Sequence, residues 1–291
     1  MSLLTGGFLL AQAPPPPPPP PTPPPPPEVS LAGKTRTETK VEKLAMGAKL
    51  WVKNRNGFIR VEGWDREEVS ISADIRDSDR RRIDLVVQRK GEDLDVEALF
   101  QQGSWGFNFN FSQSPRCEMT LRVPRKIQAH FRTTNGSVVV SGLAGYARCE
   151  TTNGDIRVKD LSGEVHAETT NGTLEAHNLK ARLKGETTNG RIVLEDVEGG
   201  IRAETTNGSI RARNLDGWGE GIRLETTNGS ITVDLGRATG EVSAENANGT
   251  IDAKVPNAQV LESSKHSVRL KLPGHNQKII LETTNGGITV R

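Results

Sequence analysis

The sequence has little of what builds compact cores, covalent staples or charge-driven binding sites. Its 291 residues include only 2 cysteines and 4% aromatic residues, and the formal net charge is +2. Two cysteines exclude a disulfide framework and a thiolate zinc cluster. A charge so close to zero argues against a nucleic-acid or anionic-membrane binder, which would carry a basic excess. With 30 glycines, the composition predicts thin cores and many turns.

Long apolar runs are also missing. The run from Leu3 to Ala13 is too short to cross a bilayer, so no transmembrane segment is expected. Residues 1–13 resemble the hydrophobic part of a secretory signal, and Ala11-Gln12-Ala13 fits a small-x-small cleavage site, although no basic segment precedes them. We therefore expect a signal-like leader and export to the periplasm, the cell envelope or the exterior.

A proline block follows the leader. Residues 14–27 are all proline except Thr22, which predicts a polyproline II rod of roughly 40 Å at about 3.1 Å per residue. We expect a linker that spaces the rest of the chain from its attachment. The alternative is a ligand for adaptor domains with aromatic grooves.

The strongest signal is an internal repeat of Thr-Thr-Asn-Gly. The first Thr and the Asn of its copies are Thr133 and Asn135, Thr151 and Asn153, Thr169 and Asn171, Thr187 and Asn189, Thr205 and Asn207, Thr226 and Asn228, and Thr283 and Asn285. With the variant Asn246-Ala247-Asn248-Gly249 and a degenerate copy from Ser263, nine units of 17–21 residues fill residues 127–291. A period this regular is typical of stacked-repeat proteins.

Apolar and polar residues alternate on both sides of each Asn-Gly, which indicates short strands joined at corners. An antiparallel meander of Asn-Gly hairpins would explain the alternation. A solenoid also explains the constant phase, because each position stacks on its counterpart about 4.8 Å away. The sequence therefore predicts an all-β parallel β-solenoid (β-helix) of about nine coils, in which the repeated Thr and Asn side chains form ladders.

Charged residues follow the same period. From the second copy onward a glutamate precedes each Thr pair, as at Glu150, Glu168 and Glu186, and a basic residue often stands two positions earlier, as at Arg148 and Lys184. Neighbouring acidic and basic columns are expected to fix the strand register and keep the surface soluble.

The ends of the repeat array differ. Residues 28–126 are β-rich but irregular, and we expect them to form the N-terminal cap, with Asn56-Gly57 as an outlying corner. The chain stops within a coil at residues 288–291 with no evident cap. That edge is expected to be covered by a partner, a swapped strand or end-to-end self-association.

No catalytic, cofactor or metal site is expected. The histidines of the repeats fall on outward positions, and the chain has no Gly-rich phosphate loop, His-Glu-x-x-His or Gly-x-Ser-x-Gly motif. Carboxylates recur in every repeat, whereas a catalytic pair would be a local departure from it.

Departures from the repeat are the candidate binding sites. Trp218 lies in an insertion at residues 216–221, where it would dock a partner, stack on a sugar or fold back as a plug. Trp105, Phe107, Phe109 and Phe111 alternate along one segment, as the aromatic core of the cap or an exposed binding strip. Cys149 occupies an inward position, and its pairing with Cys117 is left open.

Three segments together resemble a known bacterial family. They are residues 54–65, the run Leu121-Arg122-Val123-Pro124 and the Thr-Thr-Asn-Gly array, so the resemblance covers about residues 36–291. The family comprises adhesin-like β-strand-repeat proteins of largely uncharacterised function. The resemblance implies an exported or envelope-associated β-solenoid and supplies no catalytic residues.

The expected function is an exported, non-enzymatic scaffold or adhesin-like module that binds an unknown protein or glycan. An envelope stress or regulatory component acting through a protein partner is the alternative, and a polysaccharide-active enzyme is a distant third.

Overall fold

The computed structural model describes residues 35–78, 82–101 and 114–291. All described residues belong to one compact unit. The predicted leader at 1–13, the proline linker at 14–27 and the aromatic segment with Trp105, Phe107, Phe109 and Phe111 lie outside the described residues. Within the described ranges every regular element is a β-strand, and no helix is long and apolar enough to cross a membrane.

The regular repeats form a stack of parallel strands. Its strands are β8 (Gln128–Arg132), β9 (Val138–Ser141), β10 (Ala144–Asn153), β11 (Ile156–Asn171), β12 (Leu174–Asn189), β13 (Ile192–Glu198), β14 (Ile201–Asn207), β15 (Ile210–Asp216), β16 (Ile222–Asn228) and β17 (Ile231–Asp234). Each pairs in parallel with the strand one repeat away, so that Thr151 lies opposite Thr169 and Asn153 opposite Asn171. Identical positions therefore align in columns.

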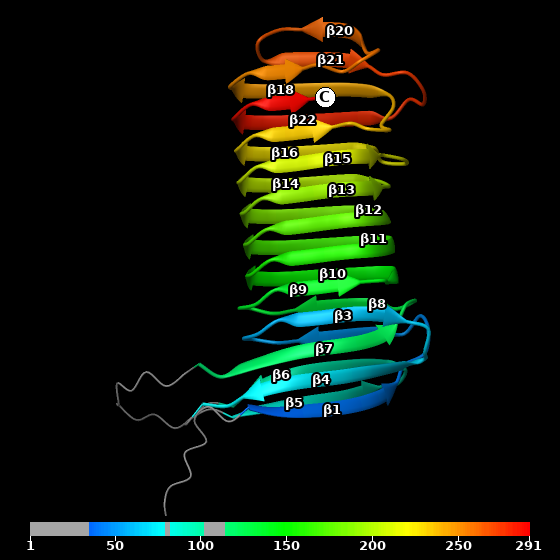
Figure 1. Cartoon of the computed structure of the whole chain (residues 1–291), viewed down its shortest axis with the longest axis vertical. Helices are drawn as coiled ribbons and strands as arrows, with labels where there is room; N and C mark the ends of the chain where they lie inside the picture. The colour runs from blue at the N-terminus through cyan, green and yellow to red at the C-terminus, as the bar shows by residue number, and fades with distance from the viewer. Residues whose placement is uncertain (1–34, 79–81, 102–113) are drawn as a thin grey trace, which may run out of the picture. The chain divides into compact units, whose positions relative to one another are not determined.

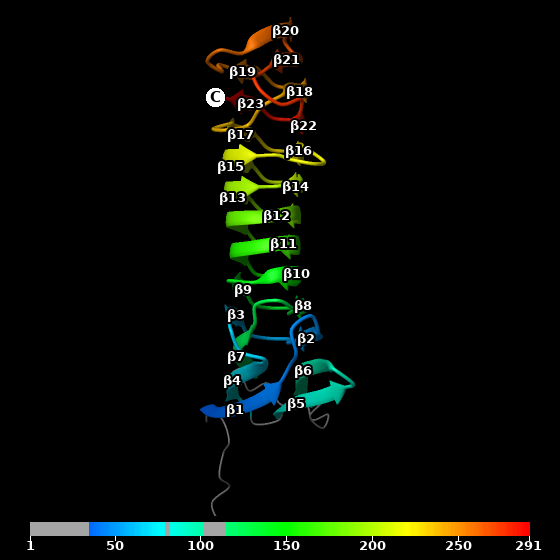
Figure 2. The ribbon, with the colours of Figure 1, turned by 90° about the vertical axis from the view of Figure 1, so that its right-hand side faces the viewer.

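The stack has two faces, which Figures 1 and 2 show from two sides. Segments that lead into Asn-Gly, such as β14 and β16, form one face, and segments that follow it, such as β13 and β15, form the other. Alternate side chains point between the faces, where the column Ile156, Leu174 and Ile192 is buried. Burying one apolar row from each face gives a core only two side chains thick, which explains the scarcity of aromatic residues.

The N-terminal end closes the stack with antiparallel strands. Its strands are β1 (Thr35–Lys43), β2 (Lys49–Lys53), β3 (Ile59–Trp64), β4 (Glu68–Arg76), β5 (Ile83–Lys90), β6 (Asp93–Phe100) and β7 (Arg116–Pro124). Strands β2 and β3 pair in parallel with β8 and β9 on one side and with β6 and β7 on the other. The pairs β5–β6, β4–β7 and β1–β4 are antiparallel.

Charged side chains bridge the two outermost strands of this end. Arg36 and Lys40 of β1 donate hydrogen bonds to the main-chain carbonyls of Ile83 and Leu85 in β5, the second at 2.9 Å. These bonds occupy backbone acceptors that an edge strand would otherwise offer to another chain. Two of the acceptors along β5 are thus already used within this end of the stack.

At the opposite end the chain order and the stacking order differ. The strands there are β18 (Glu241–Asn248), β19 (Ile251–Ala253), β20 (Gln259–Ser263), β21 (Ser267–Lys271), β22 (Lys278–Asn285) and β23 (Ile288–Val290). Strand β22 pairs in parallel with β16 on one side and β18 on the other, and β23 lies between β17 and β19. In Figure 1 the red C-terminal strands accordingly lie between the yellow β16 and the orange β18.

This insertion corrects two sequence-based expectations. The edge at residues 288–291 is not open, because β23 has a partner strand on each side and the antiparallel pair β20–β21 covers β18 instead. The degenerate copy from Ser263 lies in that hairpin and does not form a corner of the stack. Because both ends of the parallel stack carry antiparallel pairings, the sheet as a whole is mixed.

Candidate functional site

The Asn-Gly corners line up along one edge of the stack, here called the Asn-Gly edge. Each Asn side-chain nitrogen donates to the side-chain oxygen of the next Asn, at 2.8–3.0 Å. In spatial order the ladder contains Asn56, Asn135, Asn153, Asn171, Asn189, Asn207, Asn228, Asn285 and Asn248. Asn56 therefore does belong to the array, and the last two members are out of chain order.

The threonine column bonds differently from a side-chain ladder. The first Thr of each copy is buried, and its hydroxyl donates to the carbonyl oxygen of the glycine one level away in the stack, as Thr151 does to Gly136 at 2.9 Å. The other members are Thr133, Thr169, Thr187, Thr205, Thr226 and Thr283. Threonine thus satisfies a main-chain acceptor at the corner.

Glycine is required at this edge mainly by close stacking. Gly154 and Gly190 are outside the positive-φ region, so conformational freedom does not explain them. A Cβ atom on Gly190 would lie closer than 3.0 Å to the carbonyl of Gly172, and the same holds between Gly154 and Gly136. The corner therefore admits no side chain.

At the opposite edge of the stack, here called the second edge, the chain bends at residues that the sequence did not single out. Asp160, Asn178, Asp196 and Asn214 all have φ between 52° and 55°, where Asp and Asn are the most tolerated non-glycine residues. The Asn178 amide donates to Asp160, and the Asn214 amide donates to Asp196. The sequence pattern that marks this edge is an Asp or Asn every 18 residues. It is harder to recognise than Thr-Thr-Asn-Gly, because two residue types alternate at the position.

A groove of about 950 Å³ runs along the face that carries the acidic column. Its walls are the glutamates from Glu168 to Glu245 and the second threonines, such as Thr170 and Thr188. In the regular repeats each acid has a nearby base: Lys184 lies 2.8 Å from Glu186, and Arg202 pairs with Glu204. Most of the acidic charge in this part of the groove is therefore compensated.

The balance changes where the C-terminal strands are inserted. Ile280 and Ser243 occupy the basic positions two residues before Glu282 and Glu245. Burial and a hydrogen bond shared with Glu225 raise the pKa of Glu282, although Arg223 of the neighbouring strand lies 3.0 Å from its carboxylate and opposes the shift. Elsewhere burial opposes the charge of Glu150, but hydrogen bonds with His130 and Arg148 outweigh it and lower that pKa.

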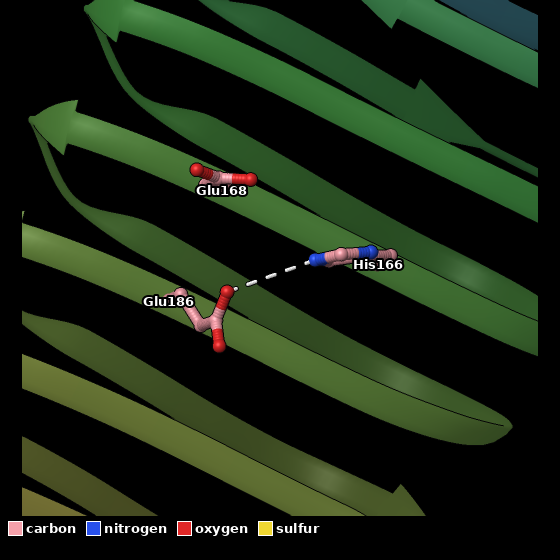
Figure 3. Close-up of side chains that lie close together, drawn as sticks. All are labelled: His166, Glu168 and Glu186. Carbon is pink, nitrogen blue, oxygen red and sulfur yellow. Dashed lines mark ion pairs between the residues drawn. The ribbon is translucent and has the colours of Figure 1, made fainter.

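His166, Glu168 and Glu186 form a cluster on this face, shown in Figure 3. One ligand atom from each lies within 4.8 Å of the others, and His166 Nε2 is 3.7 Å from Glu186 Oε2. A bound zinc would need all three about 2.0–2.2 Å from the ion. Because the acids recur at every level, the cluster is explained as part of the acidic column.

Trp218 lies in a pocket of about 520 Å³ formed by two loops. Its side chain is 55% exposed, so it is not a buried plug. Strands β16 and β22 are neighbours, and the loops that precede them, 217–221 and 272–277, therefore meet at the second edge. The sequence analysis named Trp218 but missed the second loop, because its contribution depends on the inserted strand.

The two cysteines offer no reactive thiol. Cys117 and Cys149 are free and buried. Burial raises the pKa of each thiol to about 12, so the nucleophilic thiolate is scarce at neutral pH.

Comparisons with known proteins place the chain in a family. The model described as Toastrack DUF4097 matches residues 49–291. Similar solved structures include a candidate adhesin from Bacteroides fragilis (12% identity, TM-score 0.46, covering 88% of this chain and 97% of that one). Another is a candidate lipid-binding protein from Parabacteroides distasonis (14% identity, TM-score 0.38, covering 89% and 98%). No curated protein sequence matches. The chain belongs to the Toastrack DUF4097 family.

Proposed function

We propose that this protein is an exported, non-enzymatic, adhesin-like binding module built as a β-solenoid of about nine coils. One observation carries the proposal: the polar groups that repeat are used to hold the stack together. The Asn amides bond to one another, and the Thr hydroxyls bond to glycine carbonyls. These amides and hydroxyls are therefore not free to meet a ligand, which leaves the outward groove and the interruptions of the repeat as the binding surfaces.

The acidic face supports a binding role better than a catalytic one. Glycoside hydrolysis needs two carboxyl groups whose surroundings assign one as acid and the other as base or nucleophile. Here Glu186 and Glu204 have equivalent places in the column, each beside its own base. Repeated equivalent carboxylates, each paired with a base, are typical of a solvated surface and not of a catalytic pair.

The outward placement of such a module follows from the N-terminal sequence. The signal-like residues 1–13 support export, and the proline-rich residues 14–27 supply a stiff spacer. Mass spectrometry of the protein from an envelope fraction tests this part. Loss of residues 1–13 is the expected result, and an intact N-terminus on cytoplasmic protein contradicts export.

A surface-binding assay tests the function. Labelled full-length protein is titrated onto whole bacterial cells and onto isolated cell-wall polysaccharide, with heat-unfolded protein as control. We expect saturable retention on at least one surface and no release of reducing ends. Absence of saturable retention overturns the binding module, and release of reducing ends overturns its non-enzymatic nature. Retention that protease treatment of the cells abolishes identifies a protein partner instead of a glycan.

A further inference from the structure

Three loops that depart from the repeat meet at the second edge. They are residues 217–221, 235–240 and 272–277, and the first and last project on the right of Figure 1. Main-chain hydrogen bonds join the last two: Leu272 N donates to Gly240 O at 2.7 Å, and Glu241 N donates to Gln277 O at 2.8 Å. A Cβ atom on Gly221 would overlap the carbonyl of Lys278, so the first loop lies directly against the start of β22, where the third loop ends, and both loops line one pocket.

We propose that the pocket between the first and third loops binds a short stretch of glycan, with Trp218 as the platform on which a sugar ring stacks. This inference rests on the proposed binding function and names the ligand class and the residues that select it. The pocket volume of about 520 Å³ falls within the range of small-molecule sites.

Trp218 has the exposure that stacking requires. A large aromatic side chain that is 55% exposed offers one flat apolar surface, and the C–H face of a sugar ring is the complementary shape. Gly217 and Gly219 flank it, and a Cβ atom on Gly219 would meet nothing within 4 Å. The loop beside Trp218 therefore has open space around its backbone.

The rest of the pocket supplies hydrogen-bonding groups. Its lining includes Glu220, His275, Asn276, Gln277 and Lys278. Amide and imidazole groups both donate to and accept from hydroxyls, the Glu220 carboxylate accepts, and the Lys278 ammonium donates; hydroxyls are the groups a sugar presents at its edge. Gln277 is half-buried in this lining, and its side-chain amide can donate to or accept from a hydroxyl at the edge of a sugar ring.

The same lining argues against a protein ligand. The centre of a protein interface is apolar and enriched in several aromatic or aliphatic side chains. Trp218 is the one apolar side chain in this pocket, and the other lining residues are polar or glycine. One aromatic plane surrounded by polar groups matches a sugar, which is apolar on one face and polar around its edge.

The hydrogen bonds between the loops preorganise the site. The carbonyl of Gln277 is fixed by Glu241, and Glu220 is held by Arg182 at 3.1 Å. Groups already held in place lose little conformational entropy when a ligand binds.

Glycan-array binding of the full-length protein tests the proposal. The array carries neutral hexose oligomers, N-acetylhexosamine oligomers, uronic-acid oligomers and peptidoglycan fragments, and titration calorimetry measures the strongest positive. We expect at least tenfold weaker binding for Trp218→Ala and a smaller loss for Gln277→Ala. Leu261→Ala is the matched control, because Leu261 is also an exposed apolar residue of the C-terminal part but lies outside the pocket.

Each outcome has a distinct meaning. If Trp218→Ala keeps wild-type affinity for the glycan and the wild-type unfolding curve, the pocket is not the site, although the binding function stands. If the wild-type protein binds no glycan on the array but is retained by cells, the ligand class proposed here is wrong. If it binds neither glycan nor cells, the proposed function itself falls.

Discussion

The regular region of the stack (residues 144–216) and the inserted region (residues 217–291) use the same repeat with different results. In the regular region each strand pairs with the strand one repeat away in sequence, and the corners are tight. In the inserted region the last strands separate β16 from β18, and the loops lengthen to permit this. Repetition fixes the scaffold, and the interruption creates the one pocket with an exposed tryptophan among the described residues.

The two regions also differ in how completely their buried polar groups are hydrogen-bonded. Four buried side-chain atoms lack a hydrogen-bond partner among the described residues, and three of them belong to Thr239, Asn246 and Gln277 in the inserted region. Unsatisfied buried groups are costly and usually mark a functional or irregular place. The regular region contributes only His166 to this group, which indicates that it is built mainly for stability.

Deleting residues 278–291 should produce the largest difference in stability between the regular and the inserted region. In a stack that followed chain order, this deletion would fray one end. Here it removes β22 and β23 from the middle, so residues 241–271 lose the strands to which β18 and β19 pair. Hydrogen exchange should show protection lost throughout 241–271 but kept in 144–207. Retained protection in 241–253 would mean that β18 can stack on β16 in chain order.

Filling a corner glycine should have the next largest effect. Gly190→Ala places a methyl group against the main-chain carbonyl of Gly172, and backbone cannot move aside as a flexible side chain can. We expect a loss of about 4 kcal/mol in the free energy of unfolding, measured by urea denaturation. Gly200→Ala is the control, because its Cβ would find its nearest neighbour at 3.4 Å. Equal stabilities for the two variants would remove close stacking as the reason for glycine.

Asparagine substitutions compare the two regions directly. Asn189→Ala deletes two ladder bonds of 2.9 Å, and a loss of about 2 kcal/mol in the free energy of unfolding is expected. Asn246→Thr restores the common residue at a place where the Asn nitrogen is buried without a partner among the described residues. Its hydroxyl can use the carbonyl one level away, and we expect a gain of up to about 1 kcal/mol. A loss from Asn246→Thr would show that the His266 contact matters more than the buried nitrogen.

The acidic column gives the smallest effect, with opposite signs in the two regions. Glu150 has a lowered pKa, so its charge stabilises the fold above its ordinary pKa and this contribution is lost as pH falls through the folded value. Glu282 has a raised pKa, so its charge opposes folding at neutral pH and the penalty disappears in acid. At pH 7, Glu150→Gln should lower the free energy of unfolding and Glu282→Gln should raise it, each by less than about 1 kcal/mol.

Thermal unfolding between pH 3 and 7 measures both glutamate effects. For Glu282→Gln the difference from the wild-type protein should shrink as the pH falls through the raised pKa and be gone below the ordinary glutamate pKa of about 4.3. For Glu150→Gln the difference should persist down to about that pH and shrink below it. Parallel shifts of the same sign would show that the two levels of the column are equivalent.

The sequence by itself determined the repeat, the strand alternation and the inward and outward positions. These are local properties: Thr169 and Asn171 recur at a fixed phase, and a two-residue period sends alternate side chains to opposite faces. The same pattern singled out Trp218 as a departure. The pattern did not reveal the second edge, because the same positive-φ position is filled by Asp at 160 and by Asn at 178.

The order in which the repeats stack could be learned only from the folded structure. The copies at Thr226, Asn246 and Thr283 are so similar that the sequence favours none of the possible neighbours, and chain order was the natural expectation. The observed order follows from long-range pairing, with β22 accepted between β16 and β18 while the β20–β21 hairpin closes the end. That choice places the loop before β22 beside Trp218, so the candidate site exists only in the folded stack.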